Sequence, residues 1–295
     1  MTLSWQERFR AAFTGLVVAD LRAAIRATAP FGEGASPLSC SQADHTQTEE
    51  TFAGNPALLT WRQVLVQMAQ SGHQAPLDRP SQEAIRVIEV RSPIEVCLLA
   101  LPLMLLNLER PGATALIEWA EQQGLQLETQ NLLKAFFQLL CKGMETVQPA
   151  YASVSLPKTL DWLAAESFDD PLLALAVKIT LQARGQYGLA LQLADLASMN
   201  SQELLPLVGL LSTLQEGLSG VPLSWRLGYL NGAVTYPTRM RYWAIANEAA
   251  LWQLADGLFY RWVGLSSSVH QQPELTYPVV QIGTAVHWAS GRSSL

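Results

Sequence analysis

RFRAAFTGLVVADL, residues 8–21, is the stretch of sequence that decides the fold. Its apolar residues recur at spacings of three and four, as they do on one face of an α-helix. The pattern extends in both directions and predicts an amphipathic or buried helix over residues 4–28. Asp20 falls among the apolar positions, and we expect it to have a structural role as a local cap or pairing partner.

The same periodicity predicts helices along most of the chain, whereas strand signals are weak because no alternating run is joined to an Asn-Gly or Asp-Gly turn. The fold class is therefore all-α. We expect one helical domain over residues 1–265, with a break at 149–157 that could mark a subdomain seam. Residues 266–295 are expected to form an extended or flexible tail. Further helices are expected over residues 55–70, 81–90, 94–107, 111–123, 129–145, 158–165, 170–183, 187–197, 202–218 and 239–262.

Composition excludes several classes of protein. With 49% hydrophobic and 15% charged residues, the chain can bury a large core and does not resemble a disordered one. A net charge of -6 gives no support for a nucleic-acid partner. No apolar run is long enough to span a membrane. The three cysteines, at positions 40, 97 and 141, lie far apart and form no CxxC pair, which fits a reducing compartment. The start of the sequence, MTLSWQERFR, lacks the apolar core of a signal peptide. We therefore expect a cytoplasmic protein.

Three stretches follow the order of a known family. Residues 8–21 read like an opening helix with the pattern R-F-x-G-A-L-x-G-x-A-x-G-D-A-x-G, and residues 100–105 match a middle segment. Gly209 and Gly217, followed by Val221-Pro222-Leu223-Ser224-Trp225, match a late segment that ends in I-P-x-x-W. Over residues 4–262 the chain resembles the ADP-ribosylglycohydrolases. The resemblance implies an orthogonal multi-helix bundle in which two magnesium ions hold the ribose hydroxyls and activate water for cleavage of an ADP-ribosyl bond.

The late metal-binding motif of that family, G-G-D-T-D-T, is missing. Counting back from the late segment, its two aspartates fall on Asn200 and Gln202, with Ser201 and Glu203 beside them. A gapped alignment places the motif at residues 184–188, which contain no carboxylate. Two magnesium ions need several carboxylates to offset their charge. Both alignments therefore predict that the late acidic pair is absent.

The early motif of the family, T-D-D-T, is matched only in outline. Asp44 and Thr46 are kept, and His45 stands in the place of the second aspartate. Imidazole suits zinc or transition metals better than magnesium. Asp44 is thus the single candidate metal ligand, and the alternative interpretation of this stretch is an ordinary polar loop. We expect no metal or other cofactor, with magnesium needed only if the chain is an active hydrolase.

The leading hypothesis is a catalytically inactive ADP-ribosylglycohydrolase-like protein that acts as a binding, regulatory or scaffolding module, because a fold can outlive its site. One alternative is a divergent hydrolase that cleaves an ADP-ribosyl or related N-glycosidic bond with a reduced metal site. Another is a structural subunit of a larger assembly. The resemblance implies a degenerate cleft whose candidate residues are Asp20, Asp44, His45, Thr46, Asn200, Ser201, Gln202 and Glu203. The expected partner is another protein, and binding of an ADP-ribose-like ligand in this cleft is a further alternative.

Aromatic residues and arginines are dense in the last third of the chain. Trp, Tyr and Arg dominate binding hot spots. Tyr229, Tyr236 and Arg239 lie in a predicted loop, where exposure is expected, and are the interface candidates. The same region also holds Trp243, Trp252 and Phe259, which are expected to face the core. Elsewhere, Glu203, Glu216 and Glu248 are expected on solvated helix faces.

Overall fold

The computed structural model describes residues 4–28, 61–71, 92–108, 114–145, 168–197 and 201–264. Within these ranges the backbone forms helices joined by turns and short connections, with no strand, which confirms the all-α prediction. None of the helices described is long and apolar enough to cross a membrane. The elements are α1 (Trp5–Thr28), α2 (Trp61–Ser71), α4 (Pro93–Leu99), α5 (Leu101–Leu106), α6 (Thr114–Gln122), α7 (Leu127–Glu145), α9 (Pro171–Gln182), α10 (Tyr187–Ala197), α11 (Ser201–Glu216), the 3-10 turn η2 (Leu218–Gly220), α12 (Leu223–Trp225), the π-helical turn η3 (Arg226–Asn231), α13 (Tyr236–Trp243) and α14 (Glu248–Trp262).

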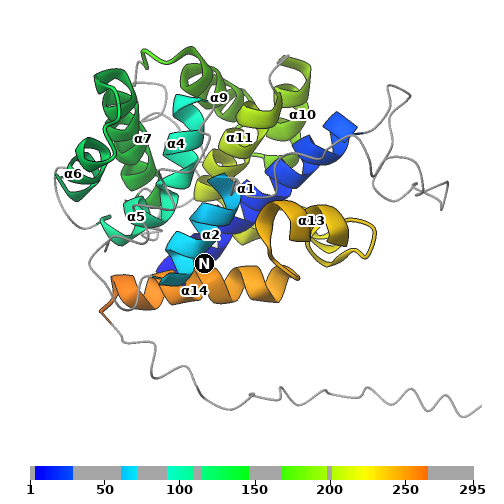
Figure 1. Ribbon diagram of the computed structural model, residues 1–295. Helices are drawn as coiled ribbons and strands as arrows, with labels where there is room; N and C mark the ends of the chain where they lie inside the picture. Colours follow the sequence, from blue (N-terminus) through cyan, green and yellow to red (C-terminus); the bar gives the residue numbers. More distant parts are fainter. Residues whose placement is uncertain are drawn as a thin grey trace, which may run out of the picture.

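The first helix is the centre of the fold. α1 runs through the middle of the molecule, with α14 below it and α9, α10 and α11 above it in the view of Figure 1. Every residue from Ala11 to Leu21 is buried, so this helix is covered on all sides rather than on one face. α11 packs against it most extensively, and α14 is next. Of the two alternatives predicted for residues 4–28, an amphipathic or a buried helix, the structure confirms the buried one.

Two glycines let α1 and α11 approach closely. A β-carbon added at Gly209 would lie 2.4 Å from Cβ of Ala19 and 2.5 Å from the carbonyl oxygen of Gly15. One added at Gly15 would lie 2.4 Å from the side chain of Thr213. These contacts pair the later part of α11 with the earlier part of α1, so the two helices run antiparallel. The hydroxyl of Tyr187 on α10 donates a hydrogen bond of 2.9 Å to the Gly15 carbonyl. A third helix is thus bonded to α1 at the point where α1 and α11 cross.

Two of the expected helices are each divided in two. The helix expected over 94–107 breaks at Ala100 because Pro102, in the first turn of α5, has no N–H to continue the hydrogen-bond ladder. The helix expected over 239–262 ends at Trp243, where Ala244 adopts a left-handed φ of 52°. A new helix then starts after Asn247, whose side chain accepts a hydrogen bond of 2.9 Å from the Ala250 amide as an N-cap.

The helices expected over residues 4–28, 111–123, 129–145, 170–183, 187–197 and 202–218 agree with the structure to within a few residues. The expectation of a loop between residues 218 and 239 is wrong, because η2, α12, η3 and the first turn of α13 lie there. Only the latter part of the helix expected over 55–70 is described, as α2. The helices expected over 81–90 and 158–165, the break at 149–157 and the tail over 266–295 lie outside the described residues. Those four predictions stay predictions.

The thiol of Cys97 on α4 provides a probe of the core. Its side chain is fully buried, and burial raises the pKa of the thiol above its ordinary value. We therefore expect iodoacetamide to label Cys97 only through unfolding, with a labelling rate that rises steeply in urea. Because the folded pKa is raised, stability should also fall as the pH rises past about 8.5, where the thiol of an unfolded chain ionises.

Peptide-resolved mass spectrometry of the labelled chain measures this rate, and the half-buried Cys141 serves as the internal comparison. Rapid labelling of Cys97 in the absence of denaturant would contradict the full burial of this side chain.

Candidate functional site

Asp20 lies in the middle of α1 with a side chain that is fully buried, and both of its carboxylate oxygens are bound. Arg62 on α2 donates two hydrogen bonds to it, from Nε to Oδ2 and from Nη2 to Oδ1, each 2.6 Å long. Trp243 on α13 donates a third, 2.8 Å long, from its indole nitrogen to Oδ2. Three helices from distant parts of the sequence therefore meet at one carboxylate. We call Asp20, Arg62 and Trp243, with the flanking rings of Trp61 and Tyr242, the Asp20 cluster.

Aromatic rings hold the arginine of this cluster in place. The Arg62 guanidinium carbon lies 4.7 Å from the ring centre of Trp61 and 5.3 Å from that of Tyr242. Trp61 also packs edge-on against Trp243, with ring centres 5.6 Å apart. Burial alone lowers the pKa of Arg62, but the charge and hydrogen bonds of Asp20 outweigh it, and the pKa is raised overall. The pair is thus an ion pair between two charged groups, enclosed by rings.

A second carboxylate, that of Asp195 on α10, is paired with two arginines near the end of α1. Arg22 donates hydrogen bonds of 2.7 and 3.1 Å to Oδ2 of Asp195 on α10, and Arg26 lies 2.6 Å from Oδ1. The guanidinium of Arg22 also stacks 4.6 Å from the ring centre of Trp225. Burial raises the pKa of the Tyr229 hydroxyl, against the opposing charges of Arg22 and Arg26. The side chain of Arg22 on α1 thus contacts both α10, through Asp195, and α12, through Trp225.

Neither aspartate fits magnesium. This cation takes oxygen ligands in a near-octahedral shell and keeps several waters, so it needs carboxylate lone pairs that are open to it. Both oxygens of Asp20 accept hydrogen bonds from cationic or indole N–H groups, and both oxygens of Asp195 face arginines. A magnesium ion would have to displace a guanidinium from either carboxylate. The two carboxylates are therefore arranged for arginine rather than for a metal.

Of the other residues of the predicted cleft, the structure describes the side chains of Gln202 and Glu203 alone, and neither of them contacts the Asp20 cluster. Asp44, His45, Thr46 and Asn200 lie outside the described residues, and so does the side chain of Ser201. Gln202 is exposed and Glu203 half-buried in the first turn of α11. α11 packs on the side of α1 that carries Gly15 and Ala19, whereas Asp20 is bound from α2 and α13. A convergence of Asp20 with residues 43–46 and 200 remains a prediction.

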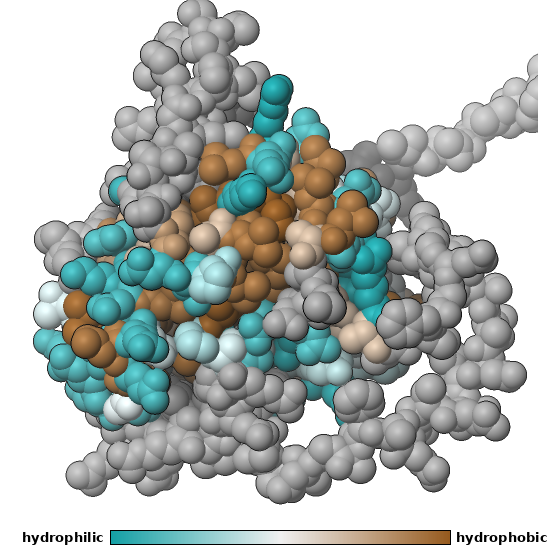
Figure 2. All heavy atoms as spheres, turned by 90° about the horizontal axis from the view of Figure 1, so that it is seen from above, coloured by the Kyte–Doolittle hydropathy of each residue, from teal (hydrophilic) through white to brown (hydrophobic). Residues whose placement is uncertain are grey.

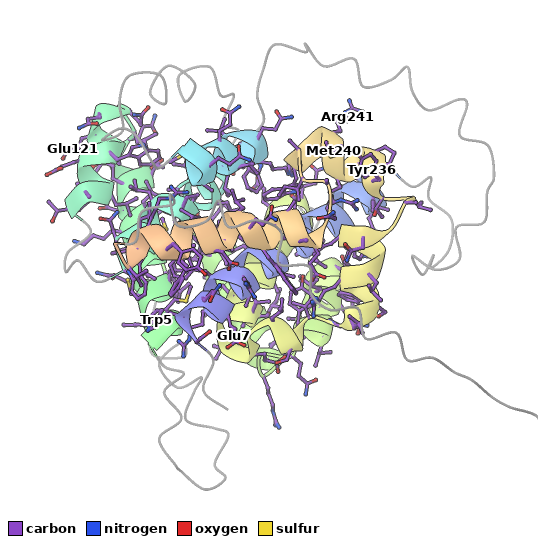
Figure 3. All side chains as sticks on the ribbon, turned by 90° about the horizontal axis from the view of Figure 1, so that it is seen from below. Trp5, Glu7, Glu121, Tyr236, Met240 and Arg241 are labelled. Atoms are coloured by element: carbon purple, nitrogen blue, oxygen red, sulfur yellow. The ribbon has the colours of Figure 1, made fainter. Side chains whose placement is uncertain are left out.

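Of the three interface candidates, only Tyr236 is exposed. It lies on α13 together with Met240 and Arg241, at the edge of the molecule in Figure 3, and 47% of it is accessible. The expectation of an exposed loop is wrong for Tyr229, which is buried in η3, and for Arg239, which is buried in α13. The physical reason is that residues 218–243 form short helical turns that fold back on one another.

Arg239 holds these turns together. Its guanidinium donates hydrogen bonds to the carbonyl oxygens of Tyr229 at 2.8 Å, Ala246 at 2.7 Å and Ile245 at 3.2 Å. Burial lowers its pKa, and the ring of Tyr236 lies 5.4 Å from the guanidinium carbon. The side chain supplies donors for carbonyls that the turns leave without helical partners, so its role is internal.

Glu248 is also internal rather than solvated. It is buried at the start of α14, and its carboxylate accepts a hydrogen bond of 2.5 Å from Arg226 and one of 3.4 Å from Asn231. Glu216 and Glu203 are half-buried, and burial raises the pKa of Glu216. The prediction of solvated faces is wrong for Glu248 because η3 folds onto the first turn of α14.

Sequence reasoning missed Arg62, although a signal for it exists. Arg62, Leu65, Val66 and Ala69 are spaced as one face of a helix, and the last three are buried. A lone charge on an apolar face predicts a buried ion pair, because unpaired charges are not buried. Of the three rings expected to face the core, Trp243 is confirmed by its full burial, whereas Trp252 and Phe259 on α14 are half-buried.

Comparisons with known proteins identify no relative: no protein-family model, no curated protein and no solved structure matches the chain.

Proposed function

We propose that this chain is a non-catalytic, ADP-ribosylglycohydrolase-like protein that binds another protein. The observation that carries the proposal is the state of Asp20, whose two carboxylate oxygens are bound by Arg62 and Trp243 in a fully buried position. A carboxylate that binds a metal, or takes or gives a proton, needs an accessible lone pair within reach of its target. Asp20 offers none to a ligand unless α2 or α13 moves.

The exposed part of α13 and η3 supports a binding role. No charged residue occurs from Leu227 to Thr238. Leu227, Val234 and Tyr236 in this stretch are 52%, 63% and 47% exposed, which is high for side chains of this size and polarity. An aromatic side chain within an uncharged surface is a common anchor of protein interfaces. We define residues 227, 234 and 236 as the α13 surface and propose it as the partner's contact.

An activity measurement tests the non-catalytic half of the proposal. The full chain is incubated with an ADP-ribosylated protein in the presence of magnesium, and released ADP-ribose is quantified. We expect no release above the control without the chain. Magnesium-dependent release that is lost in the variant Asp44→Ala would contradict the proposal and favour the divergent hydrolase.

A binding measurement tests the other half. The tagged chain is used for a native pull-down from extracts of its own cells, and captured proteins are quantified. We expect Tyr236→Ala to weaken capture of the partner about 5- to 30-fold, as truncation of an aromatic hot spot does. Leu127→Ala is the matched control, because Leu127 is 70% exposed but lies on α7.

If the wild type and Tyr236→Ala capture the partner equally well, the α13 surface is not the contact for that partner. Arg239→Ala is unsuitable as a test because that side chain stabilises the turns from within.

A further inference from the structure

Residues 226–246, which run from η3 through α13 to the turn before α14, are bonded to one another by two buried side chains. The hydroxyl of Thr235 lies 2.8 to 3.1 Å from three carbonyl oxygens of η3 and of the turn that follows it. The Arg239 guanidinium donates to the carbonyl of Tyr229 at the start of this stretch and to that of Ala246 at its end. These bonds join the beginning, the middle and the end of the stretch, so it forms one structural unit. We call residues 226–246 the α13 segment.

The α13 segment buries few apolar side chains. The buried residues of α13 are Arg239 and Trp243, and those of η3 are Tyr229 and Leu230. On α11, by contrast, apolar side chains are buried along the length of the helix. Figure 2 looks onto the side of the molecule where α9 and α10 lie in Figure 1, and hydrophobic residues gather there in one broad patch, whereas α13 lies at the edge of the molecule in Figure 3. A segment with little buried apolar surface opens at a lower free energy than the core.

The hydrogen bond from Trp243 to Asp20 joins the α13 segment to a charged group in the core. It is 2.8 Å long, and both side chains are fully buried. The contacts of the segment with α14, through Arg226 and Glu248, and with α2, through Gln63, lie partly in solvent. A hydrogen bond to a buried charge contributes more than one at the surface, because water does not compete for the same groups. The Trp243 indole is therefore placed to act as a latch.

We propose that the α13 segment opens from α1 as one unit while the core helices stay folded, and that the hydrogen bond from Trp243 to Asp20 is the latch that holds it closed. Once the segment is detached, η3 and α13 unfold, because helices of 6 and 8 residues are not stable alone in water. Opening exposes Asp20 on the side that Trp243 covers in the closed state.

The latch also controls the α13 surface, because residues 227, 234 and 236 all lie within the α13 segment. A partner that binds these residues in their closed arrangement stabilises that arrangement, and opening of the segment removes the contact. This consequence rests on the proposed function, whereas the opening itself does not.

Hydrogen–deuterium exchange of the full chain, resolved by peptide and measured over a series of urea concentrations below the unfolding midpoint, tests the proposal. In the wild type, the amides of η3 and α13 should exchange with one common rate and urea dependence, and faster than those of α11. Trp243→Phe keeps an aromatic ring but removes the donor to Asp20. It should accelerate exchange throughout the α13 segment about 10- to 100-fold, as loss of a hydrogen bond to a charged group does.

Tyr187→Phe is the matched control, because it also removes one buried hydrogen bond to α1, that of 2.9 Å to the Gly15 carbonyl. This bond persists when the α13 segment opens, so the variant should accelerate exchange in α11 and leave the segment unchanged. Equal acceleration of the segment in both variants would show that it unfolds only with the whole chain, and would overturn the proposal. Different wild-type rates in η3 and α13, or rates as slow as in α11, would overturn it as well.

Discussion

Replacing Arg62 with alanine is expected to lower the free energy of unfolding by about 3–5 kcal/mol, because the variant leaves the Asp20 carboxylate buried without a counter-charge. The side chain of Asp20 is 0% exposed and that of Arg62 is 14% exposed, so water cannot replace the lost partner. Trp243 keeps one hydrogen bond to the carboxylate, which places the loss toward the lower part of that range. Urea denaturation followed by circular dichroism measures it.

Two variants control this prediction. Arg26→Ala removes an arginine of the other ion-pair cluster, but that side chain is 53% exposed and Arg22 still binds Asp195, so the loss should be about 0–1 kcal/mol. The double variant Asp20→Leu with Arg62→Met replaces both charges with apolar groups, and it should recover most of the stability lost in Arg62→Ala. A loss below about 1 kcal/mol in Arg62→Ala would show that the buried pair does not form.

Gly209→Ala should be destabilising although alanine is the better helix former. The new methyl group would lie 2.5 Å from the backbone carbonyl of Gly15 and 2.4 Å from Cβ of Ala19. Backbone atoms cannot rotate away, so α1 and α11 must separate along the most extensive helix contact of the fold. We expect a net loss of about 2–3 kcal/mol, after an intrinsic gain of up to about 1 kcal/mol from helix propensity.

Gly257→Ala on α14 is the matched control for this change, because the nearest atom to its added methyl group, in the side chain of Arg261, is 3.9 Å away, an ordinary van der Waals distance. Only the propensity gain of up to about 1 kcal/mol should appear there. Thermal denaturation of both variants in parallel provides the comparison. Equal effects at the two positions would contradict the close crossing of α1 and α11.

The helical fold could be predicted because its signal is local. The apolar residues of 8–21 recur at helical spacings of three and four, and the structure places this stretch at the centre of the core. The divisions at Ala100 and Ala244 were not predicted because they depend on weaker cues. Pro102 near a helix start and Asn247 as a cap are readable in the sequence, but an uninterrupted apolar pattern on both sides outweighed them.

The site was harder to predict because it depends on tertiary pairing. Asp20 and Arg62 each stand at a core position of a helix, and two opposite charges at such positions indicate a partnership. Because the two residues lie 42 positions apart, their spacing along the chain does not reveal this pairing. Arg239 shows the reverse difficulty, since an arginine near aromatic residues is typical of an interface, yet this one donates to carbonyls inside the fold. The spacing of residues in the sequence does not show which backbone carbonyls of short turns will need a hydrogen-bond donor.

A crystal structure determined in the presence of magnesium chloride and ADP-ribose tests the central claim about Asp20 most directly. The account predicts that the Arg62 guanidinium remains bound to both carboxylate oxygens, at distances near the 2.6 Å found here, with the Trp243 indole on Oδ2. A magnesium ion coordinated by Asp20, with Arg62 displaced from the carboxylate, would contradict it.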